Sequence, residues 1–548
     1  MTRTKIDIIK IYKQKTALVI DDFTDMRGSI RRMLDNFGVN KVETASNGEE
    51  AIRKCESQHF DIILADYNLG DAKNGQQVLE ELRFKNLLKN TTIYMMITAE
   101  TTKDMVFGAL EYQPDDYLTK PFTQGVLQKR LDRMVWEKET LYDINNAMDK
   151  LDYDQAIQLC QQRIDLHDKY EQRCYRIMSN CLYKKHQYTQ SKKIYQGILE
   201  ERNLEWANIG LAKSMMALNE LDDAEKIFSS LISEGCLCLE IYDYLADIKS
   251  RQGDITGAQK ILETAIDISP NAIMRQEKLA ELCEDNRDWE QAEKSRKMVI
   301  RLGNNSVYET PEHHFQLARC INAEISDNPA NAQTRVKEAQ EVLRKAKRKY
   351  KDHENIELQS DIIEANIYAS AGEAEKSQKK VNGIQQRLSS ATHKSAQLLL
   401  DMAKTYKAVG DHDKANDLLI NLAASYQKDE IISEAIDRLA DEPLSKQGKQ
   451  KAVELNLQGK NLFAEKEYGK AIHLFNEALN HYPNNIGLNL NLMLALVREM
   501  TTKGATKLQL QRCNIAREKL THLGSDNPMH ERFSVLSDHL EKLQKSIT

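Results

Sequence analysis

The sequence has few of the residues that interrupt helices, with 8 prolines and 22 glycines among 548 residues. Long helices are therefore expected over much of the chain, because proline and glycine destabilise a helix interior more than other residues do. No apolar run reaches the roughly 18 residues that a membrane span needs. Near the N-terminus, Lys5, Asp7 and Lys10 interrupt the positions where a secretory signal would be apolar. We therefore expect no membrane segment and a cytoplasmic location.

The sequence also lacks a redox motif, a histidine cluster and an excess of positive charge. Its 9 cysteines are scattered, and the one close pair, Cys236 and Cys238, does not have CxxC spacing. Free thiols in a reducing compartment are the expected state. The histidines lack the spacing of metal ligands and are interpreted as surface or helix-groove residues. The net charge of −6 gives no basic field that would attract nucleic acid.

Short apolar runs alternate with helical patterns in residues 15–137. The predicted strands are 17–20, 41–45, 60–65, 93–97 and 116–119, and the predicted helices are 26–37, 49–57, 76–88, 102–110 and one that begins near residue 126. Strands that alternate with helices form a parallel sheet covered on both faces. The first domain is therefore predicted to be a doubly wound α/β domain with a five-stranded parallel sheet.

After residue 137 the strand pattern stops and a repeat of close to 34 residues begins. Ala224, Ala258 and Ala292 occupy one position of this repeat, and bulky residues flank them at fixed offsets. Small residues let two antiparallel helices approach closely, and such pairs must stack because one pair cannot bury its own apolar face. The clearest copies are 205–238, 239–272, 273–306 and 452–485, with weaker copies at 137–171, 172–204 and 396–430.

This pattern resembles the tetratricopeptide repeat (TPR) family. The resemblance implies that residues 138–548 form an all-α superhelix with a groove that binds a protein or peptide. The stretch 311–390 is helical in pattern, but its repeat register stays open. A helical face without glycine or proline runs from Val126 to Leu151. It predicts one continuous helix between the two domains, with two abutting helices and a kink near 136–139 as the alternative.

Five polar residues fall at the carboxyl ends of the predicted strands: Asp21, Asp22, Asp66, Thr98 and Lys120. Doubly wound sheets place their functional sites at this edge. Three converging carboxylates repel one another and suit a hard cation such as Mg²⁺. A carboxylate can act as a nucleophile toward a phosphoryl group. The metal ion and an ammonium group would offset charge on the transferring oxygens.

In this order and spacing, these residues resemble the CheY-like receiver domain of two-component response regulators, over residues 15–137. The resemblance implies a flavodoxin-like fold in which Asp66, in the sequence FDIILAD, is the phosphoacceptor. It implies that Thr98 is the switch hydroxyl, Lys120 is the lysine of the family's site and Tyr117 is the rotating aromatic residue. The Mg²⁺ ligands would be Asp21, Asp22, Asp66 and the backbone carbonyl of Asn68.

The resemblance also implies a cis peptide bond between Lys120 and Pro121. The sequence departs from the family pattern in the loop after Asp66. Gly70 stands where proline is common, and Gly75 falls one residue later than expected. This loop is therefore expected to be longer than usual.

Together these features predict a response regulator whose output is protein binding. A sensor histidine kinase or phosphotransfer protein would phosphorylate Asp66, and the TPR region would bind an unidentified partner. Residues 138–548 contain no motif of an enzyme or of a DNA-binding helix, so no enzymatic activity beyond turnover of the aspartyl phosphate and no nucleic-acid partner is expected. The alternative is a constitutive TPR scaffold with the receiver as a docking module. A receiver-mediated homodimer stays open.

Overall fold

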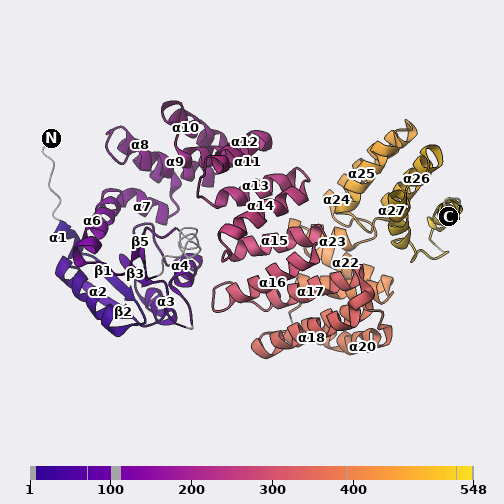
Figure 1. The fold of residues 1–548 in the computed structure, drawn as a ribbon, viewed down its shortest axis with the longest axis horizontal. Helices are drawn as coiled ribbons and strands as arrows, with labels where there is room; N and C mark the ends of the chain where they lie inside the picture. Colours follow the sequence, from indigo (N-terminus) through magenta and orange to yellow (C-terminus); the bar gives the residue numbers. More distant parts are fainter. Residues whose placement is uncertain (1–7, 71, 100–112, 392, 526, 546–548) are drawn as a thin grey trace. The chain divides into compact units, whose positions relative to one another are not determined.

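The computed structural model describes residues 8–70, 72–99, 113–391, 393–525 and 527–545 (Figure 1). The chain divides into two compact units, Met1–His313 and His314–Thr548. The first unit begins with a five-stranded sheet in the order β2-β1-β3-β4-β5, in which every pair of neighbours is parallel. The strands are β1 (Thr16–Ile20), β2 (Lys41–Ala45), β3 (Ile62–Asp66), β4 (Ile93–Thr98) and β5 (Asp116–Thr119). The predicted flavodoxin-like sheet is confirmed.

Each face of the sheet is covered by helices, because alternate strand residues point to opposite faces. On one face, Ala17, Val19 and Leu64 share a core with α1 (Ile8–Tyr12), α2 (Thr24–Phe37) and α6 (Gln124–Thr140). On the other face, Leu18 and Ile63 pack with α3 (Gly48–Ser57) and α4 (Gly75–Phe84). The helix predicted over 102–110 lies outside the described residues.

Antiparallel helix pairs occupy the three adjacent predicted repeats. These pairs are α11 (Glu205–Ala217) with α12 (Leu221–Ser233), α13 (Glu240–Arg251) with α14 (Ile255–Ile268), and α15 (Ile273–Asp285) with α16 (Trp289–Gly303). The small residues at the predicted contact positions are almost completely buried: Ala212, Ala224, Ala246, Ala258, Ala280 and Ala292. The repeat period therefore coincides with one helix pair.

The rest of the chain that the structure describes is also helical. In the first unit the remaining helices are α7 (Tyr142–Asp149), α8 (Tyr153–Ile164), α9 (Glu171–Lys184) and α10 (Tyr188–Glu201). Helix α17 (Glu312–Asp327) begins in the last two residues of the first unit and continues into the second. The second unit also contains η1 (Pro329–Asn331), α18 (Ala332–Lys349), α19 (Ile356–Ser370), α20 (Ala374–Ser390), α21 (Ala396–Ala408), α22 (His412–Ser425), α23 (Glu430–Leu439), α24 (Lys446–Ala464), α25 (Tyr468–His481), α26 (Ile486–Lys503), α27 (Lys507–Glu518) and α28 (His530–Lys545). Among the described helices, none combines the length and the apolar character that crossing a bilayer requires.

The prediction of one continuous helix from Val126 to Leu151 is wrong. Helix α6 ends at Thr140 and α7 begins at Tyr142, so two helices abut at Leu141. The Leu141 side chain is 2% exposed and packs in a core with α7, α8 and α9. The break lies where the chain passes from the core of the sheet, which contains Met134 and Val135, to the core of α7, α8 and α9, which contains Leu141. Periodicity alone cannot distinguish this arrangement from an uninterrupted helix.

Within the first unit, α4 also contacts the segment that follows α16. Lys73, just before α4, donates a hydrogen bond from Nζ to the Asn305 carbonyl at 2.8 Å. Gln77 of α4 donates from Nε2 to the Asn304 carbonyl at 3.1 Å. The rings of Phe84 and Tyr308 meet edge to face, with centroids 6.4 Å apart. One helix of the sheet domain is therefore in direct contact with the helix-pair region.

Candidate functional site

The carboxyl edge of the sheet is held by hydrogen bonds that continue past the strand ends. The Lys120 amide donates to the Thr98 carbonyl at 2.7 Å, and the Asp21 amide donates to the Ala45 carbonyl at 3.2 Å. Asp66 is the last residue of β3 and is in register with Ile97 of β4. Because these backbones are fixed by the sheet, the side chains that follow each strand are brought to one place.

Lys120 joins two of the predicted acidic residues. Its Nζ lies 2.8 Å from Asp21 Oδ2 and 2.7 Å from Asp66 Oδ2. Asp21 is 1% exposed and Asp66 is 6% exposed, whereas Asp22 is exposed to solvent. The other oxygen of Asp21, Oδ1, accepts a hydrogen bond from the Phe23 amide at 2.8 Å. Asp21 is thus held on both sides, and Asp22 is the member of the pair that faces solvent.

Burial and charge act against each other in this group. Burial raises the pKa of Asp66, and the hydrogen bond from Lys120 only partly offsets it. Burial lowers the pKa of Lys120, but its hydrogen bonds to Asp21 and Asp66 outweigh burial, so the pKa is raised. Lys120 therefore stays protonated, and the buried carboxylate would be favoured by further positive charge.

The donor set of this edge fits a hard divalent cation. One carboxylate oxygen from each of Asp21, Asp22 and Asp66 lies within 4.8 Å of the others. These are all oxygen ligands, and the exposure of Asp22 leaves room for water, which Mg²⁺ usually retains in its shell. The residues present are therefore suited to hold Mg²⁺.

The remaining predicted site residues lie on the neighbouring strands β4 and β5 and in the loop after Asp66. Thr98 is 1% exposed at the end of β4, next to the strand that carries Asp66. Tyr117 is half-buried on β5 and packs against the core on the α3 and α4 side. Asn68 is exposed, its backbone amide hydrogen-bonds to Asp66, and its side-chain oxygen accepts from the Gly70 amide at 3.3 Å. The peptide bond between Lys120 and Pro121 is cis, as expected.

Gly75 has a role at the site that sequence reasoning missed. An added Cβ at Gly75 would lie 2.1 Å from the Asp66 carbonyl oxygen, which is far inside van der Waals contact. The Gly75 amide donates to the Tyr67 carbonyl at 2.8 Å, and its carbonyl accepts from the Tyr94 hydroxyl at 2.8 Å. The start of α4 is thus packed directly on the backbone of Asp66. The sequence showed only that Gly75 is displaced from its usual position.

Comparison with known proteins finds relatives of the sheet domain. The model of the response regulator receiver domain matches residues 17–132. Chemotaxis protein CheY-3 of Vibrio cholerae is 30% identical over 122 residues, which are 22% of this chain and 92% of that protein. The chain belongs to the response regulator receiver family. Chemotaxis protein CheY of Pseudomonas aeruginosa is also 30% identical, over 117 residues that are 21% of this chain and 93% of that protein.

Solved structures match the same part of the chain. The structure of the chemotaxis response regulator CheY4 of Vibrio cholerae is 28% identical, with a TM-score of 0.21, and the match covers 22% of this chain and 98% of that one. The family model and the curated relatives identify the sheet domain as a receiver domain, and residues 133–548 lie beyond the range that the family model matches.

Proposed function

We propose that this protein is a phosphorylation-controlled response regulator in which Asp66 accepts a phosphoryl group. The observation that carries this proposal is the ammonium group of Lys120, which lies within 2.8 Å of both Asp21 and Asp66 at the carboxyl edge of the sheet. A donor phosphoryl group that reached Asp66 would meet a buried carboxylate with a fixed positive charge beside it. A sensor histidine kinase or a phosphotransfer protein is the proposed donor.

Each side chain has a distinct part in the proposed transfer. The Asp66 carboxylate attacks phosphorus and forms an acyl phosphate, while the bond from phosphorus to the donor breaks. Lys120 offsets charge on the transferring oxygens, and Thr98 donates its hydroxyl to a phosphoryl oxygen, with Tyr117 turning inward behind it. Mg²⁺, held by Asp21, Asp22, Asp66 and the Asn68 carbonyl, would supply further positive charge to those oxygens.

The proposed output is protein binding by residues 138–548, as a TPR-type superhelix. The 34-residue period, the antiparallel pairs and the buried alanines at their contacts support this assignment. No described contact favours the constitutive scaffold. The hydrogen bonds from Lys73 and Gln77 to residues 304–305 offer a direct route from receiver to repeats. Gly75, which packs on Asp66, lies between these two side chains in the sequence, so a change at Asp66 can reach them through the start of α4.

Intact mass measurement after incubation with acetyl phosphate and MgCl₂ tests the proposal. The wild-type protein should gain one phosphoryl group, and Asp66→Asn should gain none. The matched control is Asp25→Asn, an exposed acidic residue in the first turn of α2, which should be phosphorylated like the wild type. Phosphate uptake by Asp66→Asn would disprove the assignment.

The output is tested by hydrogen exchange of the same samples. Phosphorylation should change exchange in residues 304–308, and the Asp66→Asn protein should show no change under the same conditions. If phosphorylated and unphosphorylated protein exchange identically in this segment, coupling through α4 is wrong and the scaffold alternative is favoured.

A further inference from the structure

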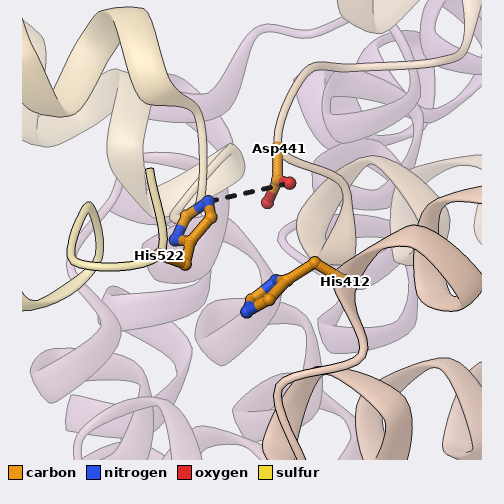
Figure 2. Close-up of side chains that lie close together, drawn as sticks. All are labelled: His412, Asp441 and His522. Atoms are coloured by element: carbon orange, nitrogen blue, oxygen red, sulfur yellow. Dashed lines mark ion pairs between the residues drawn. The ribbon is translucent and has the colours of Figure 1, made fainter. Parts of the chain in front are cut away.

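Three side chains far apart in the sequence meet in the second unit. His412 is the first residue of α22, Asp441 lies in the connection between α23 and α24, and His522 follows α27. Figure 2 shows the Asp441 carboxylate facing the ring of His522, with the ring of His412 close by. One potential ligand atom from each residue lies within 4.8 Å of the other two.

Two ring nitrogens in this cluster are buried without a hydrogen bond. His412 Nδ1 and His522 Nε2 have no hydrogen-bond partner within the described parts of the chain. His522 Nε2 lies 3.9 Å from Asp441 Oδ2, which is too long for a hydrogen bond. A buried polar atom without a partner is costly, and such atoms in native proteins commonly mark a bound ion or water.

The two imidazole rings are stacked rather than hydrogen-bonded to each other. Their centroids are 4.5 Å apart and their planes differ by 15°. A neutral imidazole nitrogen is the form of histidine that binds metals.

Asp441 is held in place by a neighbour that leaves one oxygen available. Lys407 of α21 donates from Nζ to Asp441 Oδ1 at 2.6 Å. The Asp441 carbonyl also accepts a hydrogen bond from the Ile486 amide at 3.2 Å. Metal-binding carboxylates are usually oriented by such outer partners, and here Oδ2 is the oxygen on the side of His522.

We propose that His412, Asp441 and His522 form a binding site for a divalent transition-metal ion of the Zn²⁺ class. Two imidazole nitrogens and one carboxylate oxygen make a three-ligand set, which leaves a fourth tetrahedral position open to water. With bonds of about 2.1 Å, the ligand atoms of a tetrahedral site lie about 3.4 Å apart. The three atoms here lie within 4.8 Å of one another, so each pair must approach by about 1.4 Å at most. Because the two rings are nearly parallel, at least one of them must also rotate so that both nitrogen lone pairs point at the ion. This inference does not depend on the proposed phosphorylation of Asp66.

Other clusters are less suited to such an ion. In the group of Glu263, Cys283 and Asp288, the Asp288 carboxylate already accepts hydrogen bonds from Gln259 and from the amide at the start of α16. The three carboxylates of the receiver offer only oxygen ligands, which suit Mg²⁺. Histidine nitrogens are what make the cluster in the second unit selective for Zn²⁺ over Mg²⁺.

Titration calorimetry of the untagged full-length protein with ZnSO₄ tests the proposal. Every protein in this test should carry Asp22→Asn and Asp66→Asn, so that the receiver site does not bind zinc, and this double variant is the parent protein. We expect the parent protein to bind one equivalent of Zn²⁺ with a dissociation constant below about 1 μM. In His412→Gln and in His522→Gln the affinity should fall by about 100-fold or more. His353→Gln, an exposed histidine elsewhere in the second unit, should bind as its parent does. MgCl₂ should not compete.

Two further measurements distinguish zinc binding at this site from binding to the nine cysteines and from loss of affinity through misfolding. The Co²⁺ complex should show the absorption of nitrogen and oxygen ligands without a thiolate charge-transfer band. Zinc should slow hydrogen exchange together in 407–412, 439–444 and 519–524 in the parent but not in His522→Gln, whose circular dichroism should match the parent. Equal zinc affinity in parent and both histidine variants, a thiolate spectrum, or no protection of these segments would each overturn the proposal.

Discussion

Replacement of Gly75 by alanine should damage both the stability of the receiver and the geometry of Asp66. The added Cβ would lie 2.1 Å from the Asp66 carbonyl oxygen and 3.0 Å from its carbonyl carbon. A carbon-to-oxygen contact normally needs about 3.3 Å or more, so one backbone must move by about 1 Å. The obstacle is backbone at the end of a central strand, which cannot rotate away as a side chain can.

The cost of this movement can be bounded from comparable substitutions. Overpacking a well-packed site costs about 1–3 kcal/mol, and each 1.4 kcal/mol is about tenfold in an equilibrium constant. Amides of β1 and β3 should therefore exchange about 5- to 150-fold faster in Gly75→Ala, where exchange reports unfolding of the receiver. A displacement of about 1 Å at a reacting group can cost about 100-fold in rate, so phosphorylation by acetyl phosphate should slow by about 10- to 100-fold.

The matched control is Gly28→Ala, in the interior of α2. Nothing lies within 4 Å of the Cβ that would be added there. Alanine is favoured over glycine inside a helix by about 0.5–1 kcal/mol, so exchange should slow slightly and phosphorylation should be unchanged. If Gly75→Ala exchanges and accepts phosphate at wild-type rates, the close packing of α4 on Asp66 is not a constraint and the reasoning fails.

Two further predictions concern the second unit. Burial raises the pKa of Asp361, but hydrogen bonds from Arg387 and Lys380 outweigh it and lower the pKa to about 2. A lowered carboxyl pKa adds stability above the unfolded value near 4 that is lost as the pH falls toward 2. Asp361→Asn should therefore lower the free energy of unfolding by about 2 kcal/mol at pH 7 and by clearly less at pH 3. Hydrogen exchange of α19, compared with wild type at each pH, measures this difference. An equal loss of stability at both pH values would contradict the prediction. A Cβ at Gly459 would lie 2.4 Å from the Phe475 ring, so Gly459→Ala should destabilise the α24/α25 pair by about 1–3 kcal/mol. The control is Gly383→Ala, which should stabilise α20 because nothing lies within 4 Å of the added Cβ. Similar shifts in the melting temperature of both variants would refute the close approach of Gly459 to Phe475.

The sequence alone determined the local elements of this protein. Strands β1, β3 and β4 lie within two residues of the predicted ends 17–20, 60–65 and 93–97, because a buried parallel strand reads as a continuous apolar run. The 34-residue phase predicted the helix pairs for the same reason, since small residues recur wherever two helices meet. The order of acidic, hydroxyl and basic residues at strand ends also predicted which side chains gather at one edge, because parallel strands end together.

Local patterns were less informative where the chain changes direction. The pattern predicted a helix over 76–88, but α4 ends at Phe84, where Asn86 takes a positive φ of 54° and the Leu87 amide bonds back to the Leu82 carbonyl. The break at Leu141 is similar, because it lies where the chain leaves the core of the sheet and enters the core of α7, α8 and α9. Helical periodicity continues through both positions, so only packing distinguishes them.

The tertiary structure alone decided distances and exposure. It placed Asp21 inside and its neighbour Asp22 outside, and it set Gly75 against the Asp66 backbone. It also brought His412, Asp441 and His522 together from three separate segments of the second unit. No sequence spacing encodes that cluster, because its members are 29 and 81 residues apart and meet only through the stacking of helices. A site within one repeat can be read from its period, whereas a site between distant segments depends on how the whole stack packs.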